Sequence, residues 1–150
     1  MSDIDQISDR ILRALQADGR ISNIDLAAKV GLSPSACLRR VQEMERRGII
    51  AGYRAVISAE ARDVGFVAYV MIGLSRHSTE AQQAFERTCR AAPQVRECHN
   101  ITGTVEYLLR VECRDLAAYK QFHTDVLGDF THIATITTHV VMGSPKDERA

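Results

Sequence analysis

The sequence lacks several features that would assign it to common classes of protein. It has no tryptophan, only three prolines and four phenylalanines among 150 residues, and a formal charge of zero at pH 7. No apolar run approaches the roughly 18 residues of a membrane-spanning helix, and no signal peptide precedes the first predicted helix. We therefore expect a cytoplasmic protein with no membrane segment.

The motifs of metal sites, cofactor sites and common nucleophiles are also missing. The four cysteines show no CxxC spacing, which favours buried, reduced thiols over disulfides or metal ligands. His99, His123, His132 and His139 follow no known ligand spacing. There is no glycine-rich phosphate loop and no GxSxG motif. The sequence thus predicts no metal, no cofactor and no enzymatic activity.

The most informative stretch runs from Ile21 to Gly48 and predicts two short helices joined by a tight turn. Ser22 is a good N-cap for the first helix, and Gly31 lies where a glycine in the left-handed conformation would end it. Ser33 then caps the second helix, with Pro34 at its first position, where a missing N–H costs nothing. Two helices joined by a few residues that include glycine are typical of a helix-turn-helix.

The second helix of this pair has two different faces at 100° per residue. Cys37, Leu38, Val41 and Met44 fall on one arc, which we expect to be buried. Small and basic residues fall on the opposite arc and its flank, as they do on a helix that enters the DNA major groove. The alternative is an ordinary amphipathic helix with a solvated basic face. The candidate DNA-binding residues are Ser33, Ser35, Ala36, Arg39, Arg40 and Arg47.

The charge of the whole chain gives this prediction little support. Residues 1–54 contain nine basic and seven acidic residues, and residues 55–150 contain ten and twelve. Affinity for DNA would therefore come from a local group of arginines, presented in several copies, and would depend strongly on salt.

The remaining periodicities predict a first helix and an α+β domain. Asp5 caps the first helix and Gly19 ends it, and Gly52 to Ser58 reads as a short strand. The later elements follow the order β-α-β-β-α-β, which is the ferredoxin-like pattern. They comprise strands at Phe66–Leu74, Val95–Thr102, Tyr107–Cys113 and Ile133–Met142, a helix capped by Ser78 or Thr79, and a helix from Asp115 to Gly128 with Leu116, Tyr119, Phe122 and Val126 in the core.

Two strands carry further expectations about their faces. Phe66–Leu74 is apolar on both faces, so we expect helices on one and a second copy of the chain on the other. In Val95–Thr102, strict alternation assigns Val95 to the face opposite Cys98.

Asp18 to Tyr53, DGRISNIDLAAKVGLSPSACLRRVQEMERRGIIAGY, resembles the DNA-binding half of the Lrp/AsnC (leucine-responsive, feast/famine) transcriptional regulators. The resemblance extends over nearly the whole chain. It implies a fold of class α+β, with an N-terminal winged helix-turn-helix followed by a βαββαβ ferredoxin-like effector domain. We expect the DNA-binding domain at 1–52, a strand and hinge linker at 53–65, the effector and oligomerisation domain at 66–143, and a flexible tail at 144–150.

The segment Thr102 to Tyr107, TGTVEY, is the candidate effector site. In the family the corresponding segment usually reads Gly-Asp-x-Asp/Glu-Tyr and lies at an amino-acid pocket between dimers. Gly103, Glu106 and Tyr107 match, but Thr104 stands where an acid is expected and offers only a hydroxyl. A structural β-hairpin loop is the alternative. The candidate residues are Thr102, Gly103, Thr104, Glu106, Tyr107 and, on the last strand, Thr137, although β-propensity explains that threonine equally well.

These observations predict a transcriptional regulator that binds double-stranded DNA. A small effector, expected to be an amino acid, would modulate its assembly, and the chain would form a homo-oligomer, either a dimer or a higher assembly such as an octamer. Two alternatives stay open: an architectural DNA-binding protein without a ligand, and a dimeric ferredoxin-like enzyme using Glu106, His99 and Tyr107.

Overall fold

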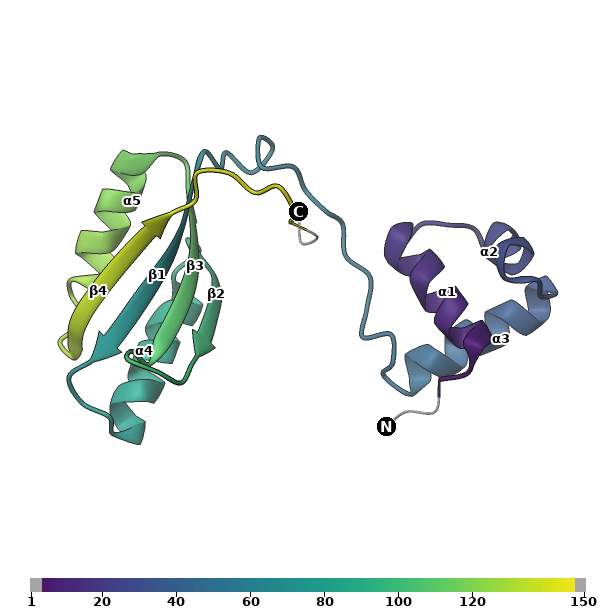
Figure 1. The fold of residues 1–150 in the computed structure, drawn as a ribbon, viewed down its shortest axis with the longest axis horizontal. Coiled ribbons are helices and arrows are strands. Elements are labelled where there is room, and N and C mark those ends of the chain that lie inside the picture. Colours follow the sequence, from purple (N-terminus) through teal and green to yellow (C-terminus); the bar gives the residue numbers. More distant parts are fainter. Residues whose placement is uncertain (1–3, 148–150) are drawn as a thin grey trace. The chain divides into compact units, whose positions relative to one another are not determined.

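The computed structural model describes residues 4–147 (Figure 1). The chain divides into two compact units, Met1–Ala55 and Val56–Ala150. Within residues 4–147, every helix is too short or too polar to cross a membrane.

The first unit consists of three helices, α1 (Gln6–Ala17), α2 (Asn23–Val30) and α3 (Pro34–Arg46). The predicted N-caps are confirmed, because the side chains of Asp5, Ser22 and Ser33 each accept a hydrogen bond from a backbone N–H in the first turn. The end of α1 differs slightly from the prediction, since Asp18, in extended backbone, is the C-cap before Gly19. The strongest local signals thus define where each helix begins.

The core of the first unit lies among the three helices. One expectation about it is wrong: periodicity predicts Leu38 on the buried arc of α3, but this side chain is 45% exposed. Cys37 and Met44 are the buried residues of α3, Val41 packs against the same core, and Leu38 is turned toward solvent. The buried residues of this core are Ile11, Ala14, Leu26, Ala27, Val30, Cys37 and Met44.

The segment predicted as a strand at Gly52 to Ser58 has no regular secondary structure. A strand is stabilised by pairing, and the described chain offers this segment no neighbouring strand. Its apolar side chains Tyr53, Val56 and Ile57 are all at least half exposed. The strand prediction is therefore wrong for the single chain.

The second unit is a four-stranded antiparallel sheet with strand order β2-β3-β1-β4. The strands are β1 (Phe66–Leu74), β2 (Val95–Asn100), β3 (Tyr107–Cys113) and β4 (Ile133–Val140). The helices are α4 (Thr79–Ala91) and α5 (Leu116–Phe122), which continues as the π-helical turn η1 (His123–Leu127). The predicted β-α-β-β-α-β order is confirmed.

Two irregularities correct the predicted faces. The register of β2 shifts between Val95 and Glu97, so Val95 and Cys98 both pack toward the helices instead of facing opposite ways. Beyond α5, the wider turn of η1 brings Leu127 into the core, while Leu116, predicted to be buried, is 65% exposed.

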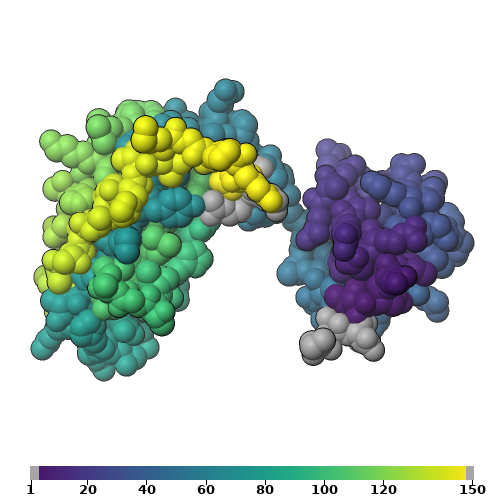
Figure 2. Space-filling model, viewed as in Figure 1, coloured from purple at the N-terminus to yellow at the C-terminus, as the bar shows by residue number. Residues whose placement is uncertain are grey.

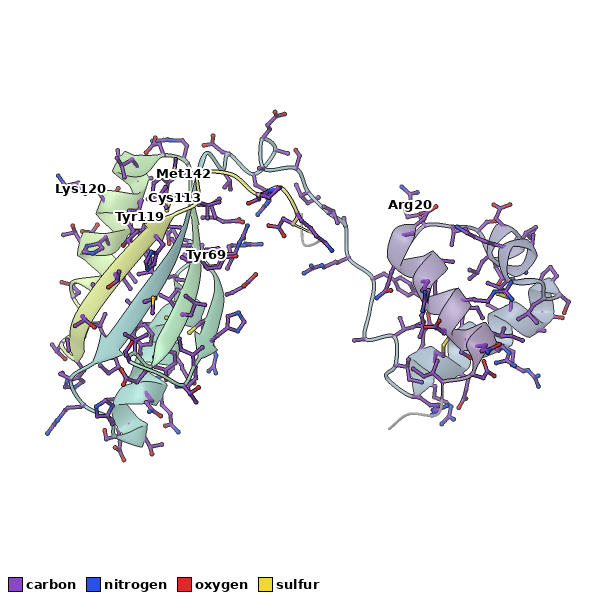
Figure 3. The ribbon with its side chains drawn as sticks, in the orientation of Figure 1. Arg20, Tyr69, Cys113, Tyr119, Lys120 and Met142 are labelled. Carbon is purple, nitrogen blue, oxygen red and sulfur yellow. The ribbon has the colours of Figure 1, made fainter. Side chains whose placement is uncertain are left out.

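Both helices of this unit cover the same face of the sheet. Phe85 of α4 and Phe122 of α5 belong to one core with Val70 and Leu109 of the central strands. Figure 3 labels a residue from each face of the sheet: Tyr119 lies between α5 and the strands, and Tyr69 lies on the opposite face. The other face, which we call the open face, carries the half-exposed side chains of Val67, Tyr69, Met71 and Leu108.

One end of the open face holds a buried carboxylate. Glu112 is only 6% exposed and pairs with Arg62, with Arg110 and, at 3.6 Å, with Arg96. Arg62 precedes β1, so this network attaches the start of the second unit to its sheet. Asp147 lies 3.7 Å from Arg110, although it belongs to the segment predicted to be a flexible tail. Residues 148–150 lie outside the described residues. In Figure 2 the yellow edge strand β4 and the chain that follows it lie at the surface.

Candidate DNA-binding and effector sites

The turn between α2 and α3 fixes the direction of α3. Gly31 has φ 74°, in the left-handed region, and the Leu32 N–H donates to the Ala27 carbonyl at 2.9 Å, which closes the end of α2. The Asn23 side chain donates to the carbonyl of Pro34 at 2.8 Å and so ties the start of α2 to the start of α3. These contacts give the helix pair a defined geometry.

The N-terminal half of α3 presents small polar side chains beside an arginine. Ser33 and Ser35 are exposed, and their hydroxyls lie 3.3 Å apart beside the N–H groups of the first turn. Ala36 is half-buried, and Arg39 is exposed one turn further on. Within residues 4–147, Arg39 makes no ion pair, so its guanidinium is available to a partner outside the chain.

Arg40 is placed differently from the other candidates. Its guanidinium donates to the Asp5 carboxylate at 2.7 Å and to the Ser8 hydroxyl at 3.1 Å, so it braces α3 against the start of α1. Hydrogen bonds from Ser8 and then from Arg40 lower the pKa of Asp5 to about 2. Arg47, the last candidate, is the exposed C-cap of α3.

Sequence reasoning wrongly assigned one exposed residue of α3, Leu38, to the core, and it placed Gln42 on the exposed arc without including it among the DNA-binding candidates. Leu38 and Gln42 are four residues apart and lie on the same side of the helix as Ser35 and Arg39. Leu38 was assigned to the core because leucine is usually buried. Its helical angle would have indicated exposure, because Leu38 lies to the side of the line through Cys37 and Met44, toward Arg39.

In the second unit, the predicted effector residues divide between different faces. Thr102, Gly103 and Thr104 are exposed in the loop between β2 and β3, with Gly103 at φ 132°. Glu106 lies at the end of this loop. Its carboxylate accepts a hydrogen bond from the Leu74 N–H at 2.6 Å and lies 3.2 Å from the His77 ring.

Tyr107 points to the opposite side of the strand from Glu106. It is 1% exposed, packs on Phe85 with ring centroids 4.8 Å apart, and donates its hydroxyl hydrogen bond to Glu86 at 3.1 Å. Burial and then the Glu86 carboxylate raise the pKa of Tyr107 to about 12. It therefore belongs to the core and does not share a surface with Glu106.

The loop approaches β4 at a glycine that sequence reasoning did not single out. A Cβ at Gly73 would lie 2.4 Å from Thr135 Oγ1 and 3.7 Å from Val105. Gly73 therefore allows β1 to lie close to β4, with Val105 of the loop in ordinary contact beside it. Thr137, opposite Met71 in the register, is on the same face and exposed. The structure thus brings Glu106, the loop and the open side of β4 to one region, without Tyr107.

The two units define a DNA-binding domain joined to a ligand-binding domain. A model of winged helix-turn-helix DNA-binding domains matches residues 4–51, and the model of the Lrp/AsnC ligand binding domain matches residues 67–150. The chain belongs to the Lrp/AsnC family of transcriptional regulators. Together these domains make it a DNA-binding regulator with a ligand-binding domain.

Known relatives match nearly the whole chain. It is 36% identical over 144 residues to the leucine-responsive regulatory proteins of Salmonella typhimurium and Escherichia coli, which covers 96% of this chain and 88% of each relative.

Solved structures match the fold closely. A transcriptional regulator of Neisseria meningitidis, in complex with L-Met, has a TM-score of 0.91 at 32% identity and covers 95% of this chain and 92% of its own. An AsnC family regulator of Agrobacterium tumefaciens has a TM-score of 0.89 at 34% identity and covers 95% of this chain and 93% of its own.

Proposed function

We propose that this regulator reads double-stranded DNA with the exposed face of α3 and that an amino acid bound beside Glu106 changes its assembly. The observation that carries the DNA interface is Arg39, an exposed guanidinium without an ion-pair partner in residues 4–147, next to small side chains on the second helix of a helix-turn-helix. Such an arrangement lets the helix approach base edges closely while arginine reaches guanine or phosphate.

The proposed DNA contacts differ in kind. Ser33 and Ser35, with the N–H groups of the first turn of α3, suit a phosphate, because the positive end of the helix dipole lies there. Ala36, Leu38, Arg39 and Gln42 are proposed to face bases, and Arg47 to contact the DNA backbone. Arg40 is also a candidate contact by sequence. Its bonds to Asp5 and Ser8 favour a positioning role instead.

The test is DNA binding with a duplex selected by the wild-type protein from a random library. We expect Arg39→Ala to weaken binding by about 1–3 kcal/mol and to relax sequence preference at one position if it reads a base. Arg47→Ala should weaken binding equally for all sequences and lower the salt slope by about one.

A matched control removes a positive charge from the same unit. Arg13 on α1 is exposed and, within residues 4–147, pairs only with Asp9, four residues away, at 2.9 Å. Arg13→Ala should bind nearly as the wild type does. Equal losses for Arg13→Ala and Arg39→Ala would mean that α3 has no special role and that general charge accounts for the binding.

The effector proposal depends on the chemistry of Glu106. Its carboxylate is 22% exposed at the end of the Thr102–Thr104 loop, so it can pair with a ligand ammonium group. Threonine hydroxyls from the loop and from Thr137 would complete a polar site, and Tyr107 would hold the loop from the core side. The L-Met in the similar Neisseria meningitidis regulator supports an amino acid as the ligand class.

Thermal melting with each of the twenty amino acids, L-methionine first, tests this site, because a ligand that binds the folded state raises the melting temperature. Glu106→Gln should abolish the rise, while its amide oxygen still accepts from the Leu74 N–H. Glu97→Gln removes a carboxylate from the same sheet, near His99, and should keep the response. If the twenty amino acids all leave the wild type unchanged, an architectural DNA-binding protein without a ligand becomes the better description.

We also propose that a second copy of the chain covers the open face of the sheet. The half-exposed side chains of Val67, Tyr69, Met71 and Leu108 form an apolar surface there, and exposed Met142 follows the edge strand. Light scattering should give at least a dimer, with an octamer as the higher alternative. Met71→Asp should shift the protein to monomer, whereas the exposed α5 variant Leu116→Asp should leave the assembly unchanged.

The site of action and the absence of catalysis also belong to this proposal. We propose 53–65 as the linker between the domains, with its last residues held to the sheet through Arg62. A DNA-binding regulator acts where the DNA is, which supports the cytoplasm. The relatives are transcriptional regulators, which supports a protein without enzymatic activity.

A further inference from the structure

A pair of cysteines lies under α4, outside the sites described above. Cys89 of α4 and Cys98 of β2 line one hollow between this helix and the edge of the sheet, together with Glu86, Arg90 and Tyr107. Cys98 faces the helix beside Val95 because the bulge at the start of β2 resets the register. The same hollow is therefore lined by two thiols that come from different elements and are nine residues apart in the chain.

The two thiols differ in exposure and in acidity. The hydrogen bond with Cys98, and then burial, raise the pKa of Cys89, which is 3% exposed. The same hydrogen bond lowers the pKa of Cys98, which is only half-buried and lies near the Arg90 guanidinium. A thiolate is the nucleophilic form of cysteine, so Cys98 suits attack and Cys89 suits the role of a second, protonated thiol.

We propose that Cys89 and Cys98 are a dithiol site that a hydroperoxide oxidises to an intramolecular disulfide. In the first step the Cys98 thiolate attacks the peroxide, the O–O bond breaks, and a Cys98 sulfenic acid and hydroxide (or alkoxide) form. In the second step the Cys89 sulfur displaces the sulfenic oxygen, which leaves as water with the Cys89 proton. Each peroxide thus takes two electrons from the thiol pair.

The other two cysteines provide internal controls. Cys37 is 0% exposed in the core of the first unit, and Cys113 is 5% exposed at the end of β3. Burial raises the pKa of both thiols, and all four cysteines are free thiols in the structure. Buried, protonated thiols react slowly, so these two should stay reduced when the pair reacts.

The experiment treats the reduced full-length protein with hydrogen peroxide, alkylates the remaining thiols and maps the peptides by mass spectrometry. We expect one linkage, joining the peptides that contain Cys89 and Cys98, with loss of two hydrogen atoms and recovery after dithiothreitol. This measurement on the wild-type protein is sufficient to test whether the Cys89–Cys98 disulfide forms. Oxidation of Cys98 to sulfinic or sulfonic acid without the linkage, a linkage to another cysteine, or no oxidation while glutathione is consumed would each overturn the proposal.

Variants then assign the order of the two steps. Cys89→Ser should let Cys98 accumulate as a sulfenic acid that dimedone traps, whereas Cys98→Ser should abolish both trapping and linkage. Cys113→Ser should react as the wild type does. Dimedone trapping at Cys89 in the Cys98→Ser variant would overturn the assigned roles.

Discussion

The two units of this regulator are each stabilised by a different kind of interaction. In the first unit the side chain that precedes each helix caps it by accepting a hydrogen bond from the backbone N–H three residues later. The core of this unit is a small cluster of side chains from the three helices. In the second unit the core exists only because four strands pair across up to 72 residues of sequence, as Ala68 does with Val140. Local chemistry therefore defines the DNA-binding unit, whereas long-range pairing defines the ligand-binding unit.

This difference has a consequence for how each unit presents its function. Most of the exposed face of α3, including Ser35 and Arg39, follows from helix periodicity, although contacts with other segments decide the placement of Arg40. The region around Glu106 exists only because β1, the β2–β3 loop and β4 meet at Gly73. The residues of a site on one helix can largely be predicted from the sequence, whereas those of a site formed by several strands cannot.

The largest expected effect tests whether the two units are stabilised independently. Phe85 in the second unit and Ile11 in the first are both 0% exposed. Phe85→Ala should lower the free energy of unfolding of its unit by about 3–5 kcal/mol, and Ile11→Ala that of the other by about 2–5 kcal/mol. Denaturant unfolding followed separately by NMR signals of each unit checks this. If either variant shifts both transitions equally, the units unfold as one and the comparison fails.

A medium effect concerns Tyr107, which joins β3 to α4 through Glu86. Its pKa of about 12 lies above the ordinary value of 10.0 because the fold favours the neutral phenol. This contribution to stability is complete below pH 10 and is lost as the pH rises from 10 to 12. Burial also raises the pKa values of Tyr53 and Tyr119, so alkaline difference spectra should show Tyr107 as the last tyrosine to ionise, and Tyr107→Phe should remove that last step. Ionisation of every tyrosine near pH 10 would contradict the assignment.

The smallest effect concerns the exposed leucine of the DNA-binding helix. If Leu38 contacts a thymine methyl group, Leu38→Ala should weaken binding by roughly 1 kcal/mol, about the value of one buried methyl or methylene group. The same substitution should matter little on a duplex in which deoxyuridine replaces thymidine, because the methyl is already missing. Equal losses on both duplexes would mean that Leu38 supports α3 in some other way.

Some parts of the fold were predictable because their signals are local. Ser22, Gly31 and Ser33 predicted the limits of α2 and the start of α3, a continuous apolar run predicted β1, and alternation predicted β3. Other parts were not, because no local signal encodes them. The residue type favoured burial for Leu38 and Leu116, but the packing leaves both exposed. Regular alternation favoured one face of β2 for Val95, but the bulge turns it to the other.

The candidate sites divide in the same way. The exposure of Ser35 and Arg39 followed from the sequence, but the bond between Arg40 and Asp5 joins residues 35 positions apart. Glu106 and Tyr107 are adjacent in a familiar motif, and only the strand geometry separates them onto opposite faces. The pairing of Cys89 with Cys98 likewise depends on how α4 packs on β2.

The sequence by itself determined the helix-turn-helix, the order of strands and helices and the family, because caps, glycines and hydrophobic periods act within a few residues. Only the tertiary structure decided which arginine is available to DNA, which members of the effector motif share a surface, and which thiols meet. Those outcomes depend on contacts between segments that are distant in the sequence, and no local pattern of residues predicts the energies of such contacts.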